Sequence, residues 1–320
     1  MSTAAVCIGG TVLYWDAIVM ALAVPVFFLA LWSGFAQNGE RRGVLWLYVP
    51  LGAALSLLIA RLMFWYCHQE QFGTLLAALS PGSGGGFCMW GVVLGFALAA
   101  GLLRLVRLAP SAAPLLDASA PALALGMALL RMSALFNGSC RGKTIIEDMR
   151  LRRLPFAASI PGSTEFRFAA FFLGALLLGL IFLVLLGRFA HGARNRDWDV
   201  FLLFLLLFGA EEVLVDSIRY DATYFNFNAF VSVSQILSAA AIVTVLAVYS
   251  RRGARHGGVG RGHWICWVCF FVGLCVAGLS EYLVQRHGNW QLRCYALMSA
   301  GVLAMVLSTA AVRRVTARRR

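Results

Sequence analysis

The feature that most constrains this chain is a series of apolar runs, each close to the roughly 20 residues that an α-helix needs to cross a bilayer. We place about nine of them, and the sixth is the shortest. They cover residues 13–35, 45–66, 86–106, 118–136, 168–186, 200–215, 228–249, 264–284 and 294–312. Inside a bilayer only helices and closed barrels satisfy their own backbone hydrogen bonds. The sequence therefore predicts an all-α fold, a polytopic membrane helix bundle.

The composition supports this class. Hydrophobic residues make up 61% of the chain and charged residues 13%, whereas charged residues form about 25% of an ordinary soluble domain. No long linker, low-complexity block or internal repeat divides the sequence. We therefore expect one membrane-embedded bundle and not a string of soluble domains.

The arginines between the apolar runs predict how the chain lies in the membrane. With the N-terminus outside, alternation of the helices places most basic loops and the C-terminal tail on one side. Their arginines are Arg41, Arg42, Arg104, Arg107, Arg188, Arg194, Arg196, Arg251, Arg252, Arg255, Arg261 and those of residues 313–320. The positive-inside rule makes that side cytoplasmic. Because the net charge of +13 is spread over short loops, it does not indicate a nucleic-acid-binding surface.

One basic loop falls on the outer side, where the positive-inside rule gives no reason for it. It contains Arg141, Lys143, Arg150, Arg152 and Arg153. Two interpretations stay open at this point. The loop could hold the phosphate of an anionic lipid, or it could be a solvated surface.

Arg131 lies toward the end of the fourth apolar run, and the polar pair Asn137-Gly138 follows it. An arginine within lipid costs about 2.5–3.5 kcal/mol on insertion scales. Such a residue should face the protein interior or a wet cavity and have an anionic partner. Arg131 is therefore a candidate site residue.

Glu211, Glu212 and Asp216 lie in the sixth apolar run or at its edge, and Arg219 follows. On a helix, Glu212 and Asp216 are spaced i, i+4, while Asp216 and Arg219 are spaced i, i+3, so these three can share a face. They could form a structural charge network that also balances Arg131, or one carboxylate could be a general base. Because lone charges are costly in lipid, we expect these arginines and carboxylates to converge on one cavity.

No cofactor or metal site is predicted. Cys266 and Cys269 have the C-x-x-C spacing of zinc and redox sites, but they lie in an apolar run and no second pair of ligands follows. We interpret them as small hydrophobic residues of a helix.

Five segments resemble, in the same order, the motifs of the prolipoprotein diacylglyceryl transferase family. They are Ala60-Arg61-Leu62, the glycine-rich stretch 84–95, the stretch 131–142, the stretch 208–219, and Ser234-Gln235-Ile236-Leu237-Ser238. The resemblance extends over roughly residues 10–250. We accordingly assign residues 1–250 to a family-like membrane domain and residues 251–320 to an additional pair of transmembrane helices with a basic tail.

The resemblance implies a reaction and its partners. Members of this family transfer the diacylglyceryl group of phosphatidylglycerol to the cysteine thiol of a prolipoprotein lipobox, in the bacterial cytoplasmic membrane. The expected partners are therefore an anionic phospholipid and a prolipoprotein signal peptide. The chemistry needs an anion site for the phosphate and a base near the thiol. Planar, permanently charged arginine side chains suit phosphate.

Carried over to this chain, the resemblance assigns two groups of residues. The expected catalytic residues are Arg131, Asn137, Glu212, Asp216 and Arg219. The expected substrate-binding residues are Tyr14, Arg61, Gly91, Gly138, Arg141 and Gly142.

Several positions depart from the family pattern. The family's histidine in the glycine-rich segment is Trp90, its asparagine after the arginine is Ala134, and its glutamate after Asn-Gly is Ser139. In the late segment, Glu212 replaces an arginine and Asp216 a glutamate. A tryptophan or an alanine cannot accept a proton, so these changes affect acid–base chemistry.

Three functions are compatible with this pattern. The first is a divergent diacylglyceryl transferase, and the second is a catalytically impaired relative that binds phospholipid or lipopeptide without turnover. The third, a transporter with an intramembrane charge cluster, is disfavoured because the sequence lacks the repeated halves typical of such folds.

Overall fold

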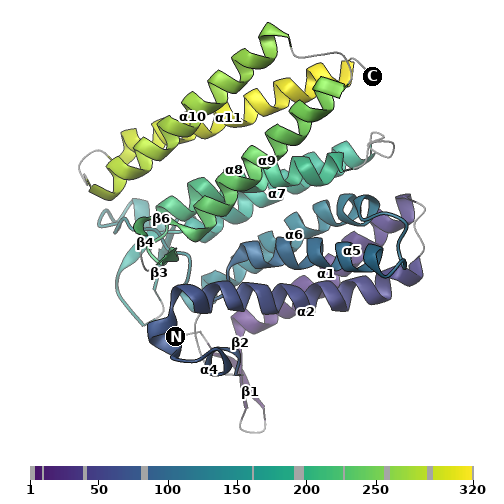
Figure 1. The fold of residues 1–320 in the computed structure, drawn as a ribbon. Coiled ribbons are helices and arrows are strands. Elements are labelled where there is room, and N and C mark those ends of the chain that lie inside the picture. Colours follow the sequence, from purple (N-terminus) through teal and green to yellow (C-terminus); the bar gives the residue numbers. More distant parts are fainter. Residues whose placement is uncertain are drawn as a thin grey trace. The chain divides into compact units, whose positions relative to one another are not determined.

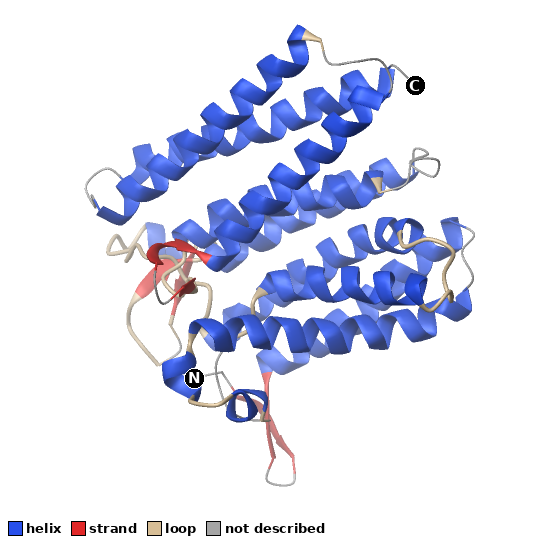
Figure 2. Ribbon diagram, viewed as in Figure 1, coloured by secondary structure: helices blue, strands red, loops and turns tan. Residues whose placement is uncertain are grey.

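The computed structural model describes residues 4–8, 11–38, 42–80, 86–160, 162–190, 198–225, 228–255, 260–286 and 291–318. Long helices dominate it, and its strands are short (Figure 1, Figure 2). The prediction of an all-α polytopic membrane bundle is confirmed. Some residues used in the sequence predictions lie outside the described ranges, namely Arg41, Gly84, Gly85, Arg194, Arg196, Arg319 and Arg320.

Seven of the described helices are long and apolar enough to cross a membrane. They are α1 (Trp15–Asn38), α2 (Arg42–Cys67), α6 (Ala113–Asn137), α7 (Ala170–Ala190), α9 (Val233–Arg255), α10 (Arg261–Arg286) and α11 (Gln291–Arg318). The third and sixth apolar runs form α5 (Met89–Leu105), which is shorter, and α8 (Asp199–Ile218), which is not among the seven. The seventh run begins with strand β6 (Asn228–Ser232), and α9 starts after it. The count of about nine spans stays a prediction.

The first of two compact units comprises residues 1–204 and 218–226. Within it, α1 packs against α6, α6 against α7, and α2 against α5 (Figure 1). Its smaller elements are β1 (Ala4–Ile8), β2 (Thr11–Tyr14), α3 (Gln69–Phe72), α4 (Leu75–Leu79), η1 (Leu151–Arg153), β3 (Ala157–Ser159), β4 (Phe166–Phe168) and β5 (Tyr224–Phe225). The pairs β1–β2 and β3–β4 are antiparallel. Both lie at the same end of the unit's helices, the end predicted to face outward (Figure 2).

Glycines bring α2 and α5 into close contact. A Cβ atom on Gly95 would lie 2.3 Å from the backbone nitrogen of Ser56, and one on Gly91 would lie 2.3 Å from the Cα of Ala60. Small residues at such spacing let transmembrane helix backbones approach closely. The structure thus places Gly91, predicted as a substrate-binding residue, at a helix–helix crossing.

Replacing Gly95 with alanine is expected to destabilise the protein by about 3 kcal/mol, the upper end of the usual cost of overpacking, because the added Cβ overlaps backbone atoms of α2. Gly101→Ala is the matched control on the same helix, since no atom lies within 4 Å of its added Cβ. Thermal unfolding in detergent checks this. Equal melting temperatures for the two variants would contradict the close α2–α5 packing.

Helix α8 begins at a cap that another helix supplies. The carboxylate of Asp117, a buried residue of α6, accepts a hydrogen bond from the backbone N–H of Phe201 at 2.8 Å. Asp199, the first residue of α8, forms an ion pair with Arg188 of α7 at 3.3 Å. The first N–H groups of a helix have no partner within it and favour negative charge. Asp117 therefore ties the start of α8 to α6.

The second unit comprises residues 205–217 and 227–320. Helix α10 packs against α11 and α11 against α9 (Figure 1). The α10–α11 crossing is tight, because a Cβ on Gly273 would lie 2.6 Å from the carbonyl oxygen of Gly301. Gln235 of α9 donates a hydrogen bond to the carbonyl of Val213 at 3.5 Å, which joins α9 to the α8 segment of this unit.

Candidate functional site

Two loops of the first unit meet beyond the end of α6. In the loop after α6, the N–H of Gly142 donates to the carbonyl of Phe168 at 2.7 Å, and Gly142 also forms a β-bridge with Arg219. The N–H of Tyr220 donates to the carbonyl of Arg141 at 2.9 Å. A Cβ on Gly142 would lie 2.8 Å from that of Phe168, so a glycine is needed there. These backbone contacts fix residues 140–143 against 218–220.

The Asn137-Gly138 pair ends α6 and starts the loop. Gly138 has a φ of 78°, the left-handed conformation that glycine adopts without strain, and its N–H bonds to the carbonyl of Ala134. The side-chain oxygen of Asn137 accepts hydrogen bonds from the N–H and the hydroxyl of Ser139, at 3.0 and 2.6 Å. Asn137 and Gly138, predicted as site residues, thus shape the turn that leads into the site.

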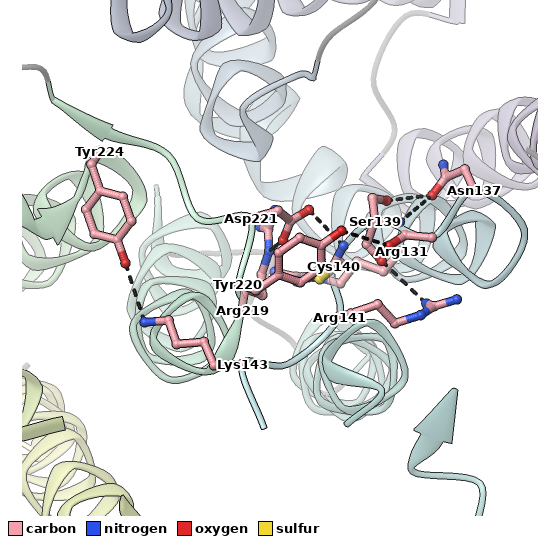
Figure 3. A network of polar contacts seen from close by, with 11 residues as sticks. Arg131, Asn137, Ser139, Cys140, Arg141, Lys143, Arg219, Tyr220, Asp221 and Tyr224 are labelled. Atoms are coloured by element: carbon pink, nitrogen blue, oxygen red, sulfur yellow. Dashed lines mark hydrogen bonds and ion pairs between the residues drawn. The ribbon is translucent and has the colours of Figure 1, made fainter. Parts of the chain in front are cut away.

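Arg131 and Arg219 belong to one polar network in this unit (Figure 3). Arg131 is 5% exposed, and its guanidinium donates to the Cys140 sulfur at 3.7 Å. The backbone N–H of Cys140 donates to one carboxylate oxygen of Asp221 at 2.9 Å. The other carboxylate oxygen accepts from the Nε of Arg219 at 3.0 Å. A cysteine and an aspartate therefore connect the two arginines.

A glycine on α7 leaves the space that the Arg131 side chain occupies. A Cβ on Gly174 of α7 would lie 2.8 Å from the Cδ and 2.9 Å from the Nε of Arg131. The guanidinium therefore lies against the backbone of α7. This contact fixes the arginine between α6, which carries it, and α7.

Asp221 is a residue of this network that the sequence did not point to. Burial works to raise its pKa, but the charge of Arg219 and the hydrogen bonds from Arg219 and the Cys140 N–H outweigh burial and lower it below its usual value. The carboxylate is thus ionised at neutral pH. Its stabilising contribution is present above the ordinary aspartate pKa and is lost as the pH falls through the lowered value.

Arg141 is fully buried and caps the end of α6. Its guanidinium lies 4.5 Å from the ring centroid of Phe171 and donates to four backbone carbonyls. These carbonyls belong to Ala134 (3.1 Å), Leu135 (3.2 Å), Ser159 (3.2 Å) and Ser139 (3.4 Å). Burial lowers the pKa of Arg141, although an arginine keeps its proton in proteins. The prediction of a substrate-binding role did not anticipate this structural position.

Arg61 anchors the loop between α2 and α5. It is 7% exposed, and it donates to the carbonyls of Ala78 at 2.7 Å and Gly86 at 3.2 Å. Its guanidinium also lies within 6 Å of three aromatic rings, which favours a charged group that has left water. The rings are those of Phe64 (5.7 Å), Phe72 (5.1 Å) and Phe87 (5.5 Å).

Three further predicted residues belong to other elements. Tyr14 ends β2 and is 41% exposed. Glu212 and Asp216 are buried in the α8 segment of the second unit, and their convergence on the arginines stays a prediction. Helix α8 ends at Ile218, so Arg219 lies just past the helix. The structure pairs Arg219 with Asp221.

Metal ligands do not gather in the described part of the chain. No group of three or more histidine, cysteine, aspartate or glutamate side chains is placed there to hold a metal ion. The site that the structure describes is thus one of arginines, a thiol and a carboxylate.

A family model, that of prolipoprotein diacylglyceryl transferase, matches residues 3–251. The chain belongs to the prolipoprotein diacylglyceryl transferase family. No curated protein matches it. The match includes the network around Arg131 and Arg219 and ends before α10, so α10 and α11 lie outside it. Membership confirms the resemblance that the ordered motifs indicated, and it supports a multi-pass membrane protein with a transferase-like function in lipoprotein biosynthesis.

Three residues that depart from the expected family pattern are buried or hydrogen-bonded in the structure. Trp90 is 3% exposed near the start of α5, and Ala134 is buried. The hydroxyl of Ser139 is bonded to Asn137. Each of these three residues is therefore buried or hydrogen-bonded.

Proposed function

We propose that this protein acts on phosphatidylglycerol at the outer face of a bacterial cytoplasmic membrane. In the family reaction, the thiol sulfur of a lipobox cysteine bonds to the diacylglyceryl carbon as the bond from that carbon to the phosphate oxygen breaks. Glycerol phosphate leaves with the electron pair, and the thiol proton passes to a base. The residues proposed to act are Arg131, Asn137, Glu212, Asp216 and Arg219.

The observation that carries the proposal is the network joining Arg131 to Arg219 through Cys140 and Asp221. Two permanently charged guanidinium groups held in one network suit the phosphate of an anionic lipid. The side chain of Arg219 is 20% exposed, so a headgroup can reach it. Gly138 and Gly142 shape the loop between the two arginines.

A second candidate is a relative that binds phospholipid or lipopeptide without turnover. Its support is the loss of a proton-accepting histidine at Trp90 and of a polar amide at Ala134, and the engagement of Ser139 with Asn137. Complementation of a bacterial strain depleted of its own transferase tests the two candidates. Growth would support the transferase, whereas membrane insertion without growth would support the binding protein.

The orientation is proposed from the arginine distribution: N-terminus outside, C-terminus in the cytoplasm. Reporter fusions after Ser250 and after Arg320 should therefore both give cytoplasmic signals. An extracytoplasmic signal at either fusion would overturn this topology.

A further inference from the structure

The two helices beyond the family match contact the end of α8 through polar side chains. Glu281 of α10 is 4% exposed. Its carboxylate accepts one hydrogen bond from the hydroxyl of Ser217 and a second from the amide of Gln285 at 2.9 Å. Tyr295 of α11 donates to the carbonyl of Ser217 at 3.5 Å. Both helices therefore converge on one residue in the last turn of α8.

Burying a carboxylate to join two apolar helices costs free energy. Charged groups in a membrane span are costly and usually functional, and they need hydrogen-bond donors. Helices can also pack without a buried charge. At the α10–α11 crossing, the small residues Gly273 and Gly301 let the two backbones approach closely. The contact between Glu281 and Ser217 is directional, so it sets both the distance and the rotation of α8 relative to α10.

The rotation of the last turn of α8 determines where the residues next to Ser217 point. Asp216 directly precedes Ser217, Glu212 lies about one turn earlier, and the chain reaches Arg219 two residues later. A rotation of the last turn would move the Asp216 carboxylate to another face. It would also change where the chain leaves the helix.

We propose that α10 and α11 form a built-in positioning element for the proposed site residues of α8, Glu212 and Asp216, in which Glu281, through Ser217, holds the last turn of that helix in register. This inference rests on the proposed function. It makes Glu281 a positioning residue outside the family-matched region, and it gives the additional helix pair a role in binding the phosphatidylglycerol headgroup.

The test uses the full-length protein in detergent with four variants: Ser217→Ala, Glu281→Ala, Glu281→Gln and the control Thr309→Val. Thr309 is a fully buried hydroxyl of α11 that donates to Met305 of its own helix at 2.8 Å, so it joins no other helix. Amide hydrogen exchange is measured over residues 212–222, and phosphatidylglycerol binding by native mass spectrometry.

Glu281→Ala and Ser217→Ala are expected to raise exchange in this segment and weaken phosphatidylglycerol binding, each about tenfold, because a hydrogen bond to a charged group is lost. Glu281→Gln should retain both properties within about threefold, since its carbonyl oxygen still accepts from Ser217. Thr309→Val should resemble the wild type. If Glu281→Ala does not fold, Ser217→Ala and Glu281→Gln still decide the matter.

The outcomes separate this inference from the proposed function. Faster exchange with unchanged lipid binding would overturn the inference and leave the proposed function standing. A Glu281→Gln variant as impaired as Glu281→Ala would overturn positioning in favour of a role for the charge itself. If the wild type binds no phosphatidylglycerol, the proposed function falls together with the lipid role of the helix pair, whatever the exchange shows.

Discussion

Diacylglyceryl transfer from phosphatidylglycerol to a lipobox peptide is expected to be at least about a thousandfold slower with this protein than with a family member that keeps the histidine. Loss of a general base commonly costs about 10²–10⁴ in rate, and loss of one preorganised donor about 10²–10³. Here Trp90, Ala134 and Ser139 stand where the resemblance to the family's motifs leads us to expect three polar residues. Such losses do not add fully, yet together they leave little catalysis.

Rates are measured as the mass increase of the peptide over time, with the same lipid and detergent for both proteins. The control is a peptide whose lipobox cysteine is replaced by serine, which should gain no mass. Turnover within about tenfold of the histidine-containing enzyme would mean that Glu212, Asp216 or Tyr14 has taken over the lost roles, and impaired chemistry would be refuted.

Arg131→Ala is expected to reduce phosphatidylglycerol binding at least about a hundredfold, because hydrogen bonds to a charged group contribute about 1.5–3 kcal/mol each and a guanidinium can supply two. The same variant should lower the melting temperature, since removing a large buried side chain beside Gly174 leaves a cavity. Lipid titration and thermal unfolding in detergent measure the two effects.

Arg104→Ala is the matched control, since Arg104 is an exposed arginine in the last turn of α5. It should leave both properties unchanged. Arg131→Lys keeps the charge but not the planar fork, so its affinity should be intermediate. Unaltered lipid binding in Arg131→Ala would remove Arg131 from the proposed site.

The helical elements could be predicted from the sequence because apolar runs of membrane length leave few alternatives to a helix. The boundaries were harder. Residues 228–232 are apolar enough to extend the seventh run, but they form β6. The close approach of α2 and α5 was not predicted. The glycines of the third run were interpreted as part of a family motif, whereas in the structure they allow the two helices to pack closely.

The site was predictable in part for a similar reason. Arg131 and Arg219 were identified because charges near lipid need partners. The partner Asp221 was missed because it lies outside any apolar run, in a loop whose path depends on backbone pairing with residues 140–143. Helical spacing could not point to Asp221, because α8 ends at Ile218 and Arg219 lies past it. Arg141 resembled a lipid ligand in a basic loop, and tertiary packing made it a helix cap.

The most direct test of the account is native mass spectrometry of the purified protein with equal amounts of phosphatidylglycerol and phosphatidylethanolamine and a lipobox peptide in the same sample. The account predicts selective retention of phosphatidylglycerol and loss of that selectivity in both Arg131→Ala and Arg219→Ala. It also predicts that the peptide gains mass at least about a thousandfold more slowly than with a histidine-containing family member. Equal retention of the two lipids by the wild type, or rapid modification of the peptide, would contradict it.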